Sequence, residues 1–144
     1  MNNRITSLII IFFLMMFSAC AHVATSPDNT EALRQKVEAE WTAKVEKDWG
    51  TVYDMLVEEY KNLIDRNTFI QRANIHIQEF SVEEVKIVEP GKEASAVVKN
   101  TIFQMGFEFK KTSKEKWIWE NGDWHLYLPP ATALGPFAAP AAKK

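Results

Sequence analysis

The spacing of the apolar residues changes once along this chain, near Ile75. Before that residue, large apolar side chains recur every three or four positions, which is the period of an amphipathic helix. After it they alternate with polar residues, and β-branched and aromatic types become frequent, as in strands. Helices followed by strands in this order are typical of the α+β class. The sequence therefore predicts three helices followed by a four-stranded antiparallel sheet.

The helical part divides into three segments. The first carries an apolar stripe at four-residue spacing, formed by Leu33, Val37, Trp41 and Val45. We expect Asp28 to cap its N-terminus, with Glu31 as the capping-box partner. A second helix is predicted from Val52 to Ile64, after the break at residues 48–50. Asn67 is the expected cap of a short third helix.

Four strands are expected after Ile75, and the turn residues between them mark where the chain reverses. In the first strand the apolar residues change phase between Ile75 and Ile87, which predicts a bulge or an interruption. The expected reversals are the turn at residues 89–92, Met105-Gly106 and Asn121-Gly122. The fourth strand ends at Pro129-Pro130, because proline cannot donate to a ladder.

The N-terminus has the pattern of an export signal. Its apolar run, residues 8–17, is too short to span a bilayer as a helix and is followed by small residues. Phe17-Ser18-Ala19-Cys20 resembles the lipobox of bacterial lipoproteins, in which the cysteine is lipidated and becomes the first residue. The alternative is ordinary secretion with cleavage at Ala19-Cys20-Ala21, which removes Cys20. We expect a periplasm-facing, lipid-anchored protein, with the outer membrane favoured because Ala21 follows the cysteine.

These features divide the chain into four parts. We expect a signal peptide over residues 1–19, a lipidated tether over 20–27, one folded domain over 28–130 and an Ala/Pro-rich tail over 131–144. The formal net charge of −2 argues against a nucleic-acid partner, which calls for a basic face. With Cys20 as the single cysteine, the domain has no disulfide and no thiolate zinc site.

Two segments carry a resemblance to a known superfamily. They are the predicted helix junction Lys47-Asp48-Trp49-Gly50-Thr51-Val52-Tyr53-Asp54-Met55-Leu56 and the predicted hairpin Trp117-Ile118-Trp119-Glu120-Asn121-Gly122-Asp123-Trp124-His125-Leu126. With the order of elements, they resemble the nuclear transport factor 2-like (cystatin-like) superfamily. The resemblance implies a cone in which three helices pack on a curved four-stranded antiparallel sheet. Its enzymes, such as ketosteroid isomerase and scytalone dehydratase, place acids, phenols or imidazoles inside the cone.

No catalytic residue can be carried over from those enzymes. Trp41 stands near the place where ketosteroid isomerase has a tyrosine, and glycine-rich phosphate loops, paired-histidine metal helices and nucleophile elbows are absent. We therefore expect no catalytic site, no metal site and no cofactor. Six aromatic residues are candidates to line a cavity: Trp41, Tyr53, Tyr60, Trp117, Trp119 and Trp124. The alternative is that they fill the core of a domain that has no disulfide.

A binding or assembly module, held on the membrane through Cys20, is the function that these features favour. Apolar residues occur in both phases of the second predicted strand, so the outer sheet face could contact a second copy or another envelope protein. Two alternatives stay open. One is a small acid/base enzyme using Tyr53, Asp65 or His125, and the other is a carrier of an apolar small molecule.

Overall fold

A computed structural model describes residues 26–73 and 75–129 of the chain. The predicted leader, Cys20 and the tail from residue 131 lie outside these ranges. The described helices are α2 (Thr30–Glu46), α3 (Trp49–Asp54), α4 (Glu58–Lys61) and α5 (Arg66–Arg72). They precede four strands, β1 (His76–Glu89), β2 (Glu93–Gln104), β3 (Phe107–Glu120) and β4 (Asp123–Tyr127). The fold is therefore α+β, as the change of periodicity predicts.

The four strands form one antiparallel sheet in the order β1-β2-β3-β4. Met105-Gly106 and Asn121-Gly122 make the two tight reversals, and all four residues have positive φ. The predicted irregularity of the first strand is confirmed, since the pairing of β1 with β2 shifts register at three places. The sheet is open, with β1 and β4 at its edges.

The helix boundaries differ from the predicted ones in three ways. The cap of α2 is Asn29, whose side chain accepts from the Ala32 N–H at 3.0 Å, so the prediction of Asp28 is wrong. The predicted second helix is divided into α3 and α4, between which Leu56 bridges to the sheet. The cap of α5 is Asp65 rather than Asn67, and its carboxylate accepts from the Thr68 N–H at 3.0 Å. At both caps the sequence offers two nearby residues that could cap, and backbone geometry selects one.

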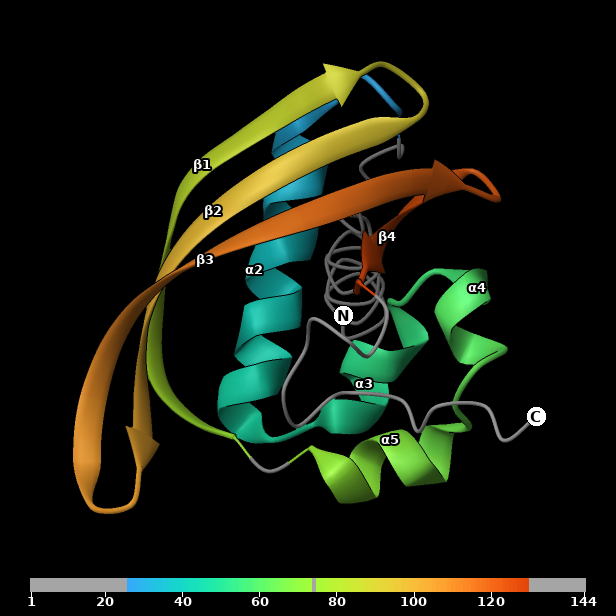
Figure 1. Cartoon of the computed structure of the whole chain (residues 1–144). Coiled ribbons are helices and arrows are strands. Elements are labelled where there is room, and N and C mark those ends of the chain that lie inside the picture. The colour runs from blue at the N-terminus through green and yellow to red at the C-terminus, as the bar shows by residue number, and fades with distance from the viewer. Residues whose placement is uncertain (1–25, 74, 130–144) are drawn as a thin grey trace, which may run out of the picture.

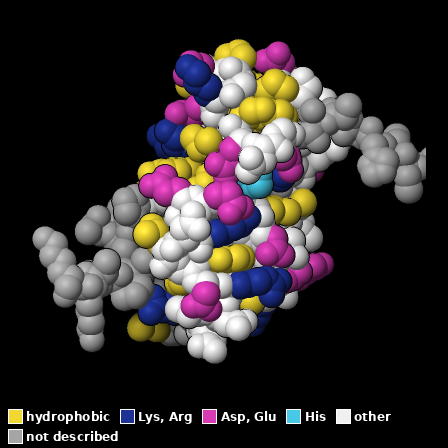
Figure 2. All heavy atoms as spheres, turned by 90° about the vertical axis from the view of Figure 1, so that its right-hand side faces the viewer, with side chains coloured by type: hydrophobic (Ala, Val, Ile, Leu, Met, Phe, Trp, Pro, Cys, Tyr) yellow, Lys and Arg dark blue, Asp and Glu magenta, His cyan; other side chains and the backbone are white. Residues whose placement is uncertain are grey.

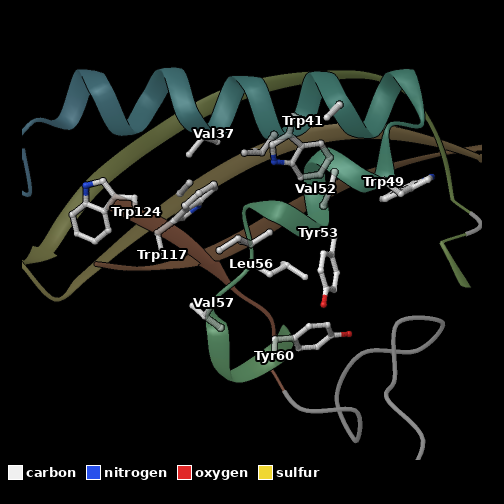
Figure 3. Packing of buried hydrophobic residues seen from close by; sticks show 14 of the residues in the cluster. Val37, Trp41, Trp49, Val52, Tyr53, Leu56, Val57, Tyr60, Trp117 and Trp124 are labelled. Carbon is white, nitrogen blue, oxygen red and sulfur yellow. The ribbon is translucent and has the colours of Figure 1, made fainter. Parts of the chain in front are cut away.

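The core lies between α2 and the concave side of the curved sheet (Figure 1). Leu33, Val37 and Trp41 of α2 are buried there, together with Trp117 of β3 and Trp124 of β4. Figure 3 shows Val37, Trp41, Trp117 and Trp124 in the space between α2 and the sheet, with the smaller helices closing the lower end of the core. Burial of these large side chains holds the described fold together in the absence of any disulfide within it.

The hairpin of β2 and β3 extends beyond the C-terminal end of α2 (Figure 1). We call residues 100–115 the arm. Because α2 ends at Glu46, no helix covers the sheet at the end of the arm. The rest of the described sheet has helices on one face, whereas the end of the arm has no helix on either face.

Candidate functional site

The arm exposes several large apolar side chains. Phe103, Met105, Phe107 and Phe109 are 37%, 88%, 67% and 53% exposed, and within residues 26–73 and 75–129 the other exposed large hydrophobic residues are Leu63 and Val88. Side chains alternate along a strand, so Phe107 and Phe109 share the inner face with Trp117, which lies under α2. On the face turned away from the arm, charged and hydrophobic side chains are intermingled (Figure 2). Exposed apolar residues gathered in one place indicate an interaction site.

One edge of the arm has no partner strand among the described residues. β4 pairs with β3 only from Lys116 to Glu120, so residues 107–115 of β3 have β2 on one side alone. The Trp119 N–H donates to the Lys92 carbonyl at 3.0 Å, which shows that the odd-numbered residues of β3 bond to β2. Backbone hydrogen bonding alternates between the two sides of an antiparallel strand, so the N–H and C=O groups of the even-numbered residues face the open edge. These are Glu108, Lys110, Thr112 and Lys114.

The other two strand edges are less suited to pairing. β1 carries three register shifts, and a bulged strand does not keep its backbone groups in phase with a partner. On β4, the Leu126 N–H donates to the Met55 carbonyl at 2.8 Å, and the Leu126 carbonyl accepts from the Val57 N–H at 3.1 Å. The strand β3, in contrast, pairs with β2 without any register shift, so the backbone groups on its free edge are regularly spaced.

Lysines surround this edge. Lys110, Lys111 and Lys114 form no ion pair within the described ranges, whereas Lys99 binds Glu83 at 2.8 Å. A hollow of about 470 Å³ borders the same edge; Glu79, Phe80, Ser81, Lys99, Asn100, Thr101, Lys110, Lys111 and Thr112 line it. The Thr101 hydroxyl donates to Glu79 there at 2.9 Å. The surface beside the open edge is therefore basic and rich in hydroxyl groups.

A buried ionic cluster lies at the base of the arm. Lys44 Nζ of α2 is 3.0 Å from Glu115 Oε1 of β3 and 2.5 Å from Glu40 Oε1, and it lies 3.9 Å from the Trp41 ring centroid. Glu40 is fully buried, and its Oε2 has no hydrogen-bond partner in the described part of the chain. Burial raises the pKa of Glu40 to about 8, and the charge of Glu115 adds to this, while Lys44 opposes it.

One lysine can neutralise only one of two buried carboxylates. Burial alone would lower the pKa of Lys44, but the charges of Glu40 and Glu115 outweigh burial and raise it. Lys44 is therefore shared between Glu40 and Glu115, and burial favours the protonated form of Glu40. This arrangement attaches β3 to α2 directly below the arm.

The structure places the six aromatic candidates in or against the core. Trp41, Tyr53, Tyr60, Trp117 and Trp124 are buried, and Trp119 is partly buried, with its ring 5.2 Å from that of Trp124. The Tyr53 hydroxyl donates to the Ile64 carbonyl at 3.0 Å. None of the six lines the hollow beside the arm. Cys20 lies outside the described residues.

The titratable residues considered for acid/base chemistry lie in separate environments. Tyr53 is buried, Asp65 is exposed at the start of α5 and His125 is half-buried on β4. Hydrogen bonds from the Thr68 hydroxyl and backbone lower the pKa of Asp65, which keeps it an anionic cap. Across the described residues, no group of three His, Cys, Asp or Glu side chains could hold a metal ion.

Two surface features were not identified as a site from the sequence. These are the exposed tip of the arm and the open edge of β3. A signal was present, because Phe107-Glu108-Phe109-Lys110 alternates and four lysines fall within residues 110–116. Alternation does not say whether anything covers the apolar face, so the same pattern fits a buried strand. Among the helices described here, none is long and apolar enough to cross a membrane.

No protein-family model matches the sequence, and neither does any curated protein. Similar solved structures do exist. One is the solution structure of a SEC-C motif-containing protein from Rhodopseudomonas palustris, with 17% identity, a TM-score of 0.51, and coverage of 72% of this chain and 76% of that one. Another is the crystal structure of a SEC-C motif-containing protein from Psychrobacter arcticus, with 13% identity and a TM-score of 0.55. That match covers 72% of this chain and 61% of the other.

These neighbours correct the resemblance drawn from sequence. Both of these structures that share the fold are SEC-C motif-containing proteins, so the assignment of the domain to the nuclear transport factor 2-like superfamily is wrong. The lipid anchor at Cys20 lies outside the described residues and stays a prediction. The two segments that carried the resemblance are a capped helix junction and an Asn-Gly hairpin, which occur in many folds. At these identities the likeness shows the fold alone.

Proposed function

We propose that this chain is a binding module of the cell envelope that holds a partner protein through its arm. One observation carries the proposal: exposed Met105, Phe107 and Phe109 lie beside a strand edge that has no partner in the described chain. An exposed apolar cluster is costly in water, and a free edge invites association. The packing of the aromatic candidates in the core supports a site on the surface rather than an internal ligand cavity.

The arm is better suited to this role than the whole outer face of the sheet. Outer-face positions of β2 and β3 are mostly polar or charged, among them Lys99, Thr101, Lys110, Thr112 and Lys114. A broad apolar contact across that face is not supported by these residues. The proposed contact therefore centres on the arm. Attachment through Cys20 remains a prediction, because that residue lies outside the described ranges.

Site-specific photocrosslinking in producing cells tests the proposal. A photoreactive residue replaces Phe107 in the full chain, and a matched variant carries it at Lys86, an exposed residue of β1. We expect a discrete crosslinked species from position 107 that is absent from position 86. Equal products from both positions, or none from position 107, would contradict a binding role for the arm. Equal melting temperatures of the two variants confirm that both are folded.

A further inference from the structure

We infer that the open edge of β3 binds an extended acidic segment of the partner by strand addition. The inference rests on the proposed function and assigns the binding mode and the chemistry of the partner. In strand addition an extended peptide forms main-chain hydrogen bonds with a free sheet edge, and alternate side chains set specificity. The occupant proposed here is a segment of another protein in which acidic and apolar residues alternate.

The backbone of β3 is arranged for this pairing. Residues 116, 118 and 120 already bond to β4 in the same way, and Glu108, Lys110, Thr112 and Lys114 continue that row without an interruption. The pairing strand β4 ends before it reaches this row. In the register of β4, Pro129 would stand opposite Lys114, and proline has no N–H to donate. Pro129 thus disfavours a longer β4, and the rest of the edge has no partner strand among residues 26–73 and 75–129.

The side chains of the arm define the chemistry of the added strand. On its outer face, the new strand would lie beside Lys110 and Lys114, which have no ion-pair partner in the described chain, with Thr112 between them and Glu108 near the tip. On its inner face, it would lie beside exposed Phe107 and Phe109 near the tip, followed by Lys111 and Ser113. Opposite charges and apolar pairs directly across strands are favourable, whereas like charges are not. An acidic residue on one face and an apolar residue on the other therefore fit this edge.

The chain's own remaining segments do not have this chemistry. Residues 1–25 and 130–144 contain no Asp or Glu, and the sequence ends in Lys143-Lys144. The strand β1 of a second copy is acidic, but its three register shifts prevent regular pairing. Charge and regularity together favour a different protein over a second copy of this chain.

The test measures fluorescence anisotropy of labelled peptides with the full chain in a nonionic detergent. One probe alternates valine with glutamate and is long enough to span residues 107–115. A second alternates valine with lysine, and a third has the valine–glutamate sequence with N-methylated backbone amides. We expect the first to bind at least about tenfold more tightly than either of the others, because it alone meets both requirements.

Two substitutions at one position separate backbone pairing from side-chain contact. Thr112→Pro removes an N–H that faces the open edge and should weaken the valine–glutamate peptide at least about tenfold. Thr112→Val keeps the N–H and the β-branched shape, so affinity should stay within about twofold. The double variant Lys110→Glu, Lys114→Glu should favour the lysine peptide instead. Circular dichroism and melting temperature check that each variant is folded.

Equal binding of the three peptides, or unchanged binding by Thr112→Pro, would overturn strand addition. Two other outcomes would show that the partner class is wrong. One is that the chain self-associates without detergent and that Thr112→Pro abolishes this self-association. The other is that the arm binds vesicles of anionic phospholipid whether or not Thr112→Pro is present. Crosslinking from position 107 without peptide discrimination would leave the proposed function intact and remove only this inference. Absence of crosslinking would remove the proposed function itself.

Discussion

At the scale of single residues, Glu40 has the most unusual surroundings in the described chain. Its carboxyl group is fully buried against Lys44 and Glu115, and the single positive charge of Lys44 serves both carboxyl groups. A buried carboxylate that shares its counter-ion with a second carboxylate is unfavourable, which favours the protonated form. The residue thus links the stability of the domain to pH.

The free energy of unfolding should fall as pH rises from about 4.5 to about 8, where Glu40 is protonated in the folded state and ionised in the unfolded state. Above that window Glu40 is ionised in both the folded and the unfolded state, and the free energy of unfolding falls no further. Glu40→Gln mimics the protonated form and should remove this dependence, making the variant more stable than wild type at pH 9 by on the order of a few kcal/mol. Urea unfolding at pH 5 and pH 9 measures this.

The control for that experiment is Glu46→Gln, an exposed position on the same helix. Its unfolding free energy should follow the wild-type pH profile. If Glu40→Gln also follows the wild-type profile, Glu40 does not have the raised pKa from which this prediction follows.

The N-terminus of α2 provides a second test at this scale. Asn29→Ala removes the side-chain acceptor for the Ala32 N–H and should lower the free energy of unfolding by about 1 kcal/mol. Asp28→Ala should leave it unchanged, because Asp28 is exposed and is not the capping residue. Thermal or urea unfolding of the two variants compares them directly, and a larger loss from Asp28→Ala would restore the cap predicted from sequence.

At the scale of elements, β3 has two different halves. Its C-terminal half lies between β2 and β4 and carries buried Trp117, while the half in the arm has one neighbour and exposed phenylalanines. Loss of a partner strand frees backbone groups at every second residue of that half. The position of a residue along β3 therefore decides whether its N–H group supports the fold or is available for binding.

Neighbouring proline substitutions test this division without any ligand. Lys111→Pro removes an N–H that bonds to β2 and should lower the free energy of unfolding by about 2–3 kcal/mol. Thr112→Pro removes an N–H that faces the open edge and should cost much less. Chemical denaturation of both variants gives the comparison. Equal losses would contradict the assignment of even-numbered residues to the open edge.

At the scale of the whole molecule, the packed body and the arm have separate roles. The body buries tryptophans between α2 and the sheet (Figure 3), while the arm extends beyond that helix (Figure 1). The arm carries exposed aromatic and basic side chains. If Cys20 is acylated, this binding surface would act close to a bilayer, since each acyl chain contributes about 0.8 kcal/mol per buried methylene.

Cys20→Ser tests membrane attachment of the full chain. The substitution should move the protein from the membrane fraction to the soluble fraction and abolish labelling by a radioactive fatty acid. The expected cause is the loss of the thiol that receives the lipid. Unlabelled wild-type protein, or a mature form that begins after Cys20, would favour the alternative of ordinary secretion.

Local sequence signals determined the order and kinds of elements in this protein. The four-residue apolar spacing of α2, the alternation after Ile75 and the turns at Met105-Gly106 and Asn121-Gly122 all depend on nearby residues. The division of the second helix did not follow from such signals. It depends on the bridge between Leu56 and Leu126, which are distant in sequence.

Tertiary structure alone decided which residues are buried and which are available. Phe109 and Trp117 have the same phase on β3, yet one is 53% exposed and the other fully buried, because α2 ends before the arm. The open edge likewise results from the shortness of β4, and the raised pKa of Glu40 results first from burial, to which the charge of Glu115 on β3 adds. Periodicity assigns a residue to a face, but only long-range packing determines whether that face is covered.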